Sequence, residues 1–298
     1  MINFKTYLKG FLMGTCDLVP GISGGTIAFI TGIYYKLIES VKGFSFQLIL
    51  DIFKYLFRLD KKNNSAKIKE DIKKLNLGFL FALLLGIFSA IILLSGGISY
   101  LLENHFAYTM SFFVGLISYS SYIIYRNIKN HKFSNIIFGL IGLLVAIPII
   151  ILKPISVADP SYFYLFLGGF FGISAMFLPG ISGAFILLIM GLYEHVLGLL
   201  RSLQQNIFPL AIFCLGLILG AFFISRLISF LFKANKCRTL YFLLGLVVGS
   251  LAIPLKEINN NLTINFINLN LILIFILLGI LTVLTIDFFR IMKEKRDI

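Results

Sequence analysis

The sequence predicts an all-α, polytopic membrane protein built from two inverted-topology repeats, each a re-entrant helical hairpin followed by three transmembrane helices. Three observations support this fold class: an apolar composition, long uncharged stretches and two internal sequence matches. Hydrophobic residues make up 59% of the 298 residues and charged residues only 13%, whereas soluble domains carry about 25% charged residues. A water-soluble domain of this size could not bury so much apolar surface, so the composition places the chain in a bilayer.

The net charge and the cysteines argue against several other functions. A net charge of +13 could attract nucleic acid, but Lys and Arg of membrane proteins gather in the cytoplasmic loops, so no nucleic-acid partner is expected. The three cysteines are widely spaced and predict neither a disulfide framework nor a metal site, and no cofactor is expected. The basic, apolar N-terminus resembles a signal peptide only superficially, because Asp17 and Pro20 interrupt it.

Six apolar stretches are long enough to cross a bilayer, which takes about 20 residues. They cover approximately residues 77–101, 106–125, 133–152, 208–232, 239–255 and 269–289. Another uncharged stretch, 160–193, is too long for one span, and Pro179-Gly180 interrupts it. The N-terminal segment has the same interruption at Pro20-Gly21. We therefore predict two re-entrant hairpins of two short helices each, over residues 4–38 and 160–198.

An amphipathic segment and a basic loop, together residues 44–74, lie between the first hairpin and the first span. Asp51, Lys54 and Arg58 recur at i, i+3 and i+7 among apolar residues, which predicts an amphipathic helix over 44–58. This helix would lie either in the cytoplasmic interface or across the base of the helix bundle. With six spans, every basic loop falls on the cytoplasmic side, and so do both termini. Hairpins that crossed the membrane fully would give the same parity.

Two ungapped matches relate the halves of the chain. Pro20-Gly-Ile-Ser-Gly24 recurs as Pro179-Gly-Ile-Ser-Gly183, and nine of 19 positions from residue 20 to 38 are identical at an offset of 159. A second match, at an offset of 130, has ten of 32 positions identical between residues 85 and 116. The predicted repeats are residues 1–152 and 153–298 of one integrated membrane domain. Because three spans per repeat is an odd number, the repeats have opposite orientations, as in secondary transporters and some intramembrane enzymes.

The repeated motif places glycines and a hydroxyl just before an apolar helix. The first N–H groups of a helix lack intrahelical partners and attract anions, so two such ends would form a phosphate-sized cradle. Alternatively, the glycines only permit a tight turn and close packing, as the small-xxx-small pair Gly216/Gly220 does elsewhere. The phosphate-binding residues predicted from the motif are Gly21, Ser23, Gly24, Gly25, Thr26, Gly180, Ser182 and Gly183.

Two charged residues are further candidates for the site. Arg226 is the only Lys or Arg within a predicted span, and an intramembrane charge is a functional candidate, so we include it among the phosphate-binding residues. Its alternative role is to extend towards the lipid headgroups. Asp17 lies three residues before Pro20 and has three alternative roles: pairing with Arg226, carrying a proton in coupled transport, or capping the turn.

These motifs carry a family resemblance. The segment DLVPGISGGT from Asp17 to Thr26, with LPGISGA from Leu178 to Ala184, resembles the bacterial polyprenyl-phosphate transporter family over nearly the whole chain. The resemblance implies a plasma-membrane transporter, not an enzyme, that returns undecaprenyl phosphate or a related lipid from the outer to the cytoplasmic leaflet for cell-wall synthesis. Protons, sodium or the lipid gradient remain alternative driving forces, and membrane lipids are the other expected partners. Ala184 departs from the family pattern, in which a small polar residue is expected.

An undecaprenyl pyrophosphate phosphatase is the alternative function. Phosphatases of the bacitracin-resistance type also have inverted repeats and Pro-Gly-x-Ser hairpins, but an arginine follows their serine. Gly24 and Gly183 occupy that position here. Phosphoryl transfer needs charge neutralisation and a positioned nucleophile. The sequence offers no convincing candidate for either, and we therefore favour transport.

Overall fold

The structure, a computed structural model, describes residues 3–19, 21–44, 73, 75–152, 154–155, 157, 159–201, 206–261 and 266–296. In these ranges the regular elements are helices, so the predicted all-α class is confirmed. The helices of the first half are α1 (Phe4–Asp17), α2 (Gly24–Ile30), α3 (Tyr34–Lys42), α6 (Leu77–Asn104), α7 (Phe106–Arg126) and α8 (Phe133–Ile151). Those of the second half are α9 (Tyr162–Met176), α10 (Gly183–Ile189), α11 (Tyr193–Arg201), α12 (Ile207–Ala234), α13 (Lys236–Ser250), α14 (Ala252–Asn261) and α15 (Phe266–Arg296).

Long apolar helices account for the predicted spans. Within the described ranges, α6, α7, α12, the α13–α14 pair and α15 are long and apolar enough to cross a membrane, and α8 forms over the remaining predicted span. Large apolar side chains point outwards from these helices; Ile92 and Phe133 are 76% and 77% exposed. Such exposure is expected where lipid, rather than water, surrounds the protein. The chain is therefore a multi-pass membrane protein.

The structure differs from the sequence prediction at one span and at both hairpin segments. The predicted span 239–255 continues through α14 to Asn261, so Lys256 lies in a helix rather than in a loop. Each hairpin segment contains three helices rather than two. The reason is a glycine after each second helix: Gly32 and Gly191 have φ of +73° and +66°, a backbone conformation that ends a helix and that glycine adopts without steric cost.

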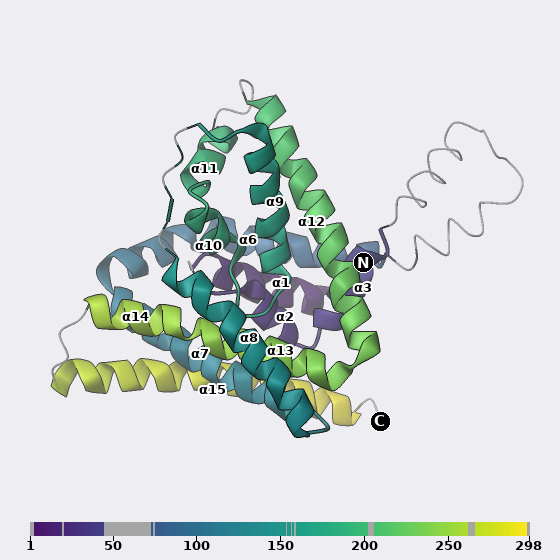
Figure 1. Ribbon diagram of the computed structural model, residues 1–298. Coiled ribbons are helices and arrows are strands. Elements are labelled where there is room, and N and C mark those ends of the chain that lie inside the picture. Colours follow the sequence, from purple (N-terminus) through teal and green to yellow (C-terminus); the bar gives the residue numbers. More distant parts are fainter. Residues whose placement is uncertain are drawn as a thin grey trace, which may run out of the picture.

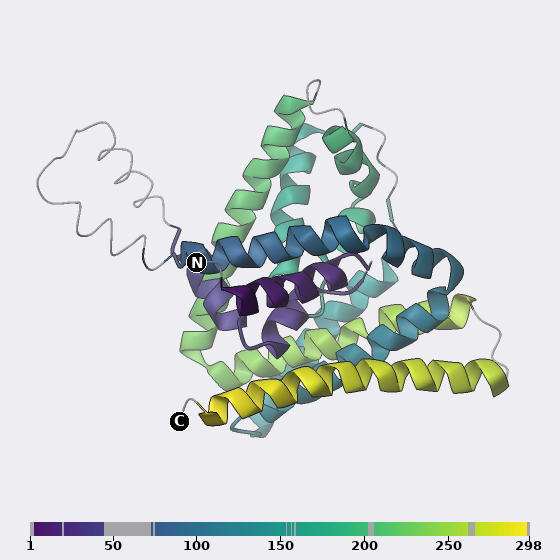
Figure 2. The same ribbon diagram turned by 180° about the vertical axis from the view of Figure 1, so that it is seen from behind.

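Three predictions fall on parts of the chain outside the described residues. The amphipathic helix 44–58 and the basic loop 61–74 lie there, apart from Phe44 and Lys73. The six-span arrangement also places the loop around Lys153 outside the cell, and this residue also falls outside the described ranges. Figures 1 and 2 show both ends of the chain on the same side of the molecule, close to the ends of α3 and α12.

Equivalent helices of the two halves pack in equivalent pairs. Helix α1 packs along α6 as α9 packs along α12, and α7 packs along α15 as α13 packs along α8 (Figures 1 and 2). Glycines permit this close approach. A Cβ added to Gly10 would collide with the backbone of α6, and a Cβ added to Gly169, 159 residues later, would collide with the backbone of α12. Gly86 and Gly216 face the same helix pairs from the other side, as the small-xxx-small spacing of Gly216 predicts.

Hydrogen bonds repeat in the same way. Thr109 donates its hydroxyl to the carbonyls of Leu101 and His105 at 3.3 and 2.9 Å. Thr239, 130 residues later, donates to the equivalent carbonyls of Leu231 and Asn235 at 2.8 and 2.9 Å. Each threonine thus joins the end of one long helix to the start of the next.

The first hairpin lies at the centre of the molecule. Six of the seven residues of α2 are buried, and Figures 1 and 2 show α1 and α2 in the middle of the molecule, between helices of both halves. The hydrophobic core extends from this hairpin to α7 and α13. The core therefore holds the first Pro-Gly-Ile-Ser turn away from the lipid.

Candidate functional site

The first turn is closed by an aspartate. Gly21 has φ +84°, which reverses the chain between α1 and α2. The backbone N–H of Gly24, the first residue of α2, donates to Asp17 Oδ1 at 2.8 Å. Of the roles considered for Asp17, the structure therefore shows capping of the turn. The carboxylate also fills the space that a side chain at residue 24 would need: a Cβ on Gly24 would lie 2.5 Å from Asp17 Oδ2.

The second turn has the same backbone with different neighbours. Gly180 has φ +88°, and Ser182 caps α10 by accepting from the Phe185 N–H at 3.4 Å. Met176 takes the place of Asp17 in the repeat, and its side chain packs against the position of Gly183. The second turn is therefore capped by a neutral hydroxyl rather than by a carboxylate.

Hydrogen bonds connect the two turns directly. The Gly180 N–H donates to Thr26 Oγ1 at 3.0 Å, and the Ser23 hydroxyl donates to the Leu178 carbonyl at 3.3 Å. Gly25 fits only as glycine, because a Cβ there would lie 2.8 Å from the Met176 carbonyl oxygen. The structure thus brings the motif residues of the first turn against residues 176–180 of the second.

Ser182 and Gly183 follow residues 176–180 in the chain, where α10 begins. With Gly180, Ser182 lines a small cavity bounded by Ser250 and Ile253, with room for about one water molecule. Ile253 also contacts the first turn, since a Cβ on Gly21 would lie 2.9 Å from its side chain. The motif hydroxyls are buried: Ser23 is 3% exposed, Thr26 2% and Ser182 6%. In this conformation the polar groups of the turns satisfy one another, so a phosphate would have to replace these internal partners.

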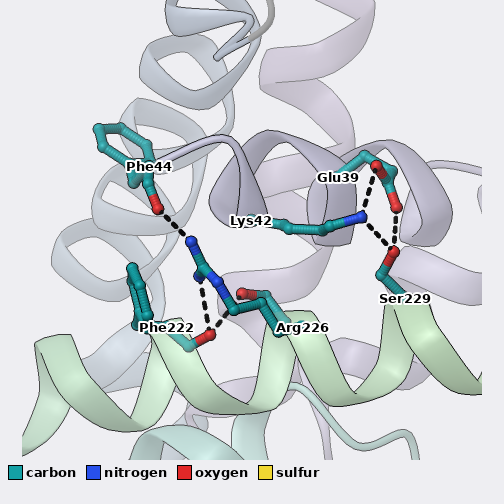
Figure 3. Close-up of polar contacts among 7 residues, drawn as sticks. Glu39, Lys42, Phe44, Phe222, Arg226 and Ser229 are labelled. Carbon is teal, nitrogen blue, oxygen red and sulfur yellow. Dashed lines mark hydrogen bonds and ion pairs between the residues drawn. The ribbon is translucent and has the colours of Figure 1, made fainter. Parts of the chain in front are cut away.

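Arg226 lies at the crossing of α12 and α3 (Figure 3). Its guanidinium donates to the Phe44 carbonyl at 2.8 Å and to the Phe222 carbonyl at 3.0 Å, and it stacks on the Phe222 ring. Next to it, Ser229 donates to Glu39 and accepts from Lys42. These contacts tie the end of α3 to α12. Arg226 therefore donates to one backbone carbonyl just after α3 and to one of its own helix, and the structure does not pair it with Asp17.

A large apolar cavity of about 590 Å³ lies beside the first hairpin. Leu12, Cys16 and Ile27 contribute one wall, and α6, α7 and α15 complete it. Its lining is almost wholly hydrocarbon, and His105 is among the lining residues. Interpretation of the sequence as a lipid transporter predicts a lateral opening between the repeats for the tail. It does not predict this cavity, because the five helices that line it meet only in three dimensions.

A second large cavity, of about 540 Å³, is basic. Lys129, Lys233, Lys236 and Arg290 line it together with aromatic side chains. Sequence reasoning counted these residues only as cytoplasmic loop and tail charges. Their position at the ends of three different spans was the available signal, but the cavity itself depends on how those ends come together.

The fold and the paired turns define a polytopic helical membrane protein organised around two contacting helix–break–helix segments. The chain belongs to the undecaprenyl phosphate translocase-like family, because the VCA0040-like family model matches residues 13–271. A polyprenyl-phosphate transporter of Vibrio cholerae serotype O1 is 41% identical over 251 residues, which cover 84% of this chain and 77% of that protein. A polyprenyl-phosphate transporter of Staphylococcus aureus is 30% identical over 288 residues, covering 90% and 93%. No solved structure gives a significant match.

Proposed function

We propose that this protein transports polyprenyl phosphate, such as undecaprenyl phosphate, across the bacterial plasma membrane without a catalytic step. Transport would return the lipid from the outer to the cytoplasmic leaflet, with both termini of the protein in the cytoplasm. The family and the names of the two relatives support this substrate. The observation that carries the mechanism is the direct contact between the two turns, through Thr26 and Gly180 and through Ser23 and Leu178.

The transport cycle would use the two halves, 1–152 and 153–298, as inverted repeats. Equivalent helix pairs and equivalent threonine hydrogen bonds support this relationship. Movement of one repeat against the other would expose the turns to each leaflet in succession. Such a movement must separate hydrogen bonds that join the halves, and those between the turns are buried.

The substrate has a charged head and an oily tail, and the two need different surroundings. The head would bind at the helix starts of the turns, where the Gly24 and Gly180 N–H groups become available once Asp17 and Thr26 release them. The tail would pass through the apolar cavity beside Leu12, Cys16 and Ile27, which adjoins the same hairpin. The lining is almost wholly hydrocarbon, so the prenyl groups could enter the cavity from lipid that is equally apolar. During this movement Arg226 would hold the end of α3 against α12, through its hydrogen bond to the Phe44 carbonyl.

Reconstitution tests this function against the phosphatase alternative. Purified protein in liposomes should accelerate exchange of a fluorescent polyprenyl phosphate between leaflets, measured by quenching of the outer leaflet. The same vesicles should release no phosphate from polyprenyl pyrophosphate above the rate of protein-free vesicles. Phosphate release without leaflet exchange would replace the transporter with the enzyme.

A further inference from the structure

The basic cavity lies where α12 ends and α13 begins, close to the last turns of α15. Its positive charges come from four places in the chain: Lys129 after α7, Lys233 in the last turn of α12, Lys236 at the start of α13 and Arg290 in α15. Figure 1 shows the ends of α12 and α15 on the side of the molecule that carries both termini. Separate elements thus deliver four cations to one open cavity.

The described residues that line this cavity include no carboxylate. Asp287 lies one helical turn before Arg290, but both of its oxygens accept hydrogen bonds from Arg126, at 2.9 and 2.8 Å. Asp287 is only 2% exposed, so it is committed to that ion pair. Within the part of the chain that the structure describes, the lining therefore has a net positive charge.

Aromatic side chains form another part of the lining, the aromatic wall. The rings of Tyr34 and Tyr35 lie 6.2 and 6.1 Å from the ring of Phe232, and Phe29 lies 5.6 Å from Tyr34. A cavity lined by both cations and aromatic rings matches a phosphate ester of a hydrocarbon chain. A small inorganic anion would leave the aromatic wall without a partner.

The repeat relationship shows that this basic character belongs to one side of the molecule only. At an offset of 130, Lys233 corresponds to Glu103 and Lys236 to Phe106. At an offset of 159, Tyr35 corresponds to Glu194. Two lysines of the cavity thus correspond to an acidic and an apolar residue in the other half. Because inverted repeats place equivalent positions on opposite sides of the membrane, this difference in charge fits a cytoplasmic position for the cavity.

The cavity adjoins the first hairpin through α2. Arg290 donates to the Ile30 carbonyl at 3.2 Å, at the end of α2, whereas Gly24 begins this helix at the turn. The two ends are roughly 9 Å apart at 1.5 Å per residue. Lys9 likewise donates to the Thr31 carbonyl, so cations offset the negative end of the α2 dipole on the side of the cavity.

We propose that this cavity, the basic vestibule, binds the phosphate monoester head of the lipid on the cytoplasmic side, as a second subsite separate from the paired turns. This inference rests on the proposed transport of polyprenyl phosphate. The head would pass between the turn and the vestibule over the length of α2, and the aromatic wall would contact the first prenyl units. The lysines of the vestibule are exposed, whereas Arg290 is half-buried, so the lysines can be exchanged without disturbing the fold.

Binding to the full-length protein in nanodiscs tests the vestibule. The probes are farnesyl phosphate, farnesol and inorganic phosphate. The triple variant Lys129→Gln, Lys233→Gln and Lys236→Gln should bind farnesyl phosphate about tenfold more weakly, as expected for the loss of three exposed ion pairs. Its affinity for farnesol should not change. The matched control is Lys132→Gln, an exposed lysine on the same side that does not line the cavity. Raising the salt from about 0.05 to about 0.5 M should weaken wild-type binding and affect the triple variant much less.

Two outcomes would contradict the proposal that the vestibule binds the lipid head. The first is unchanged affinity of the triple variant for farnesyl phosphate. The second is displacement of farnesyl phosphate by inorganic phosphate at equal concentration, which would assign the site to free phosphate. Leaflet exchange in liposomes separates this result from the proposed function. If the wild-type protein moves no lipid, the transport proposal fails and the binding data still decide the vestibule. If it moves lipid and the triple variant binds normally, only the vestibule fails.

Discussion

The two Pro-Gly-Ile-Ser turns share a sequence and a backbone but have different surroundings. Gly21 and Gly180 have φ angles within a few degrees of each other, +84° and +88°. Yet six of the seven residues of α2 are buried, compared with two of the seven in α10. A carboxylate closes the first turn and a hydroxyl the second. The motif thus determines the local chain path, whereas the residues around it determine the polarity and accessibility of each turn.

The C-terminal ends of α2 and α10 also differ in the charge of the groups that contact them. The carbonyls of Ile30 and Thr31 accept from Arg290 and Lys9. The equivalent carbonyls, those of residues 189 and 190, accept from a backbone N–H at Ile155 and from the Tyr164 hydroxyl. The far end of the first short helix therefore contacts charged groups, whereas that of the second contacts neutral ones.

The largest expected effect on stability comes from substitution of Gly24 and Gly183, the first residues of α2 and α10. A Cβ on Gly183 would collide with the backbone carbonyl of Gly172, which cannot move aside, whereas a Cβ on Gly24 meets the side chain of Asp17. We expect Gly183→Ala to lower the free energy of unfolding by about 2–3 kcal/mol and Gly24→Ala by about 1 kcal/mol. Both should reduce lipid binding, and the larger Gly→Val changes should abolish it.

Thermal unfolding in detergent measures this difference. Gly97→Ala is the control, because no atom lies within 4 Å of its added Cβ and alanine favours a helix. Equal losses at residues 24 and 183 would show that the two turns are equally rigid, and the contrast between them would be lost.

A second prediction concerns a residue that only one half possesses. Arg226 corresponds to Gly96 in the first half, and its guanidinium holds the end of α3 through Phe44. Arg226→Ala should destabilise the protein by about 1 kcal/mol, because it removes a charged donor to the exposed Phe44 carbonyl and to the partly buried Phe222 carbonyl. Arg226→Lys should recover only part of this, since a point charge cannot replace a planar fork.

Stability and leaflet exchange together assign the role of Arg226. We expect the Tm of the alanine variant to fall, with a matching fall in transport. Normal stability with abolished transport would instead make Arg226 a ligand of the phosphate, as its place in an apolar span predicted.

A third prediction exchanges the charge that distinguishes the turns. Asp17→Asn keeps the size of the side chain and an oxygen that can accept from Gly24, so the fold should be retained. It removes a negative charge from the proposed phosphate site, and affinity for farnesyl phosphate should rise by about tenfold. Weaker binding would show that the carboxylate supports the head indirectly, for example by carrying a proton. Met176→Leu, at the equivalent position of the second turn, should leave affinity unchanged.

Hydropathy and internal identity were enough to predict the spans, the two interrupted segments and the matching turns. Each depends on residues close in sequence, such as Pro179 and Gly180 within an uncharged stretch. The third helix of each hairpin segment was missed, although Gly32 and Gly191 were part of the match and carry the φ that ends the second helix. The prediction placed a helix end only at the Pro-Gly pairs, and it did not treat Gly32 and Gly191 as helix ends.

The partners of the charged residues could not be predicted in the same way. Phe44 accepts from Arg226 across 182 residues, and Arg290 reaches Ile30 across 260. The basic vestibule likewise combines residues that follow three different spans. Charge counting predicts the side of the membrane for each lysine, but it carries no information about which helix ends meet. Those contacts arise from the packing of whole helices, where the glycines of α6 and α12 decide the crossings.

The smallest expected effect concerns the two serines of the turns. Ser23 donates across the halves to Leu178, whereas Ser182 accepts within its own helix. Each Ser→Ala change removes one neutral hydrogen bond, worth roughly 0.5–1.5 kcal/mol, so lipid affinity should fall by about threefold to tenfold. If both hydroxyls serve one central site, the double variant should lose more than either single variant. A double-mutant cycle on farnesyl phosphate binding would reveal any coupling between them. Ser99→Ala, an exposed serine of α6, is the control. A double variant no weaker than Ser23→Ala alone would confine the site to the first turn and remove Ser182 from it.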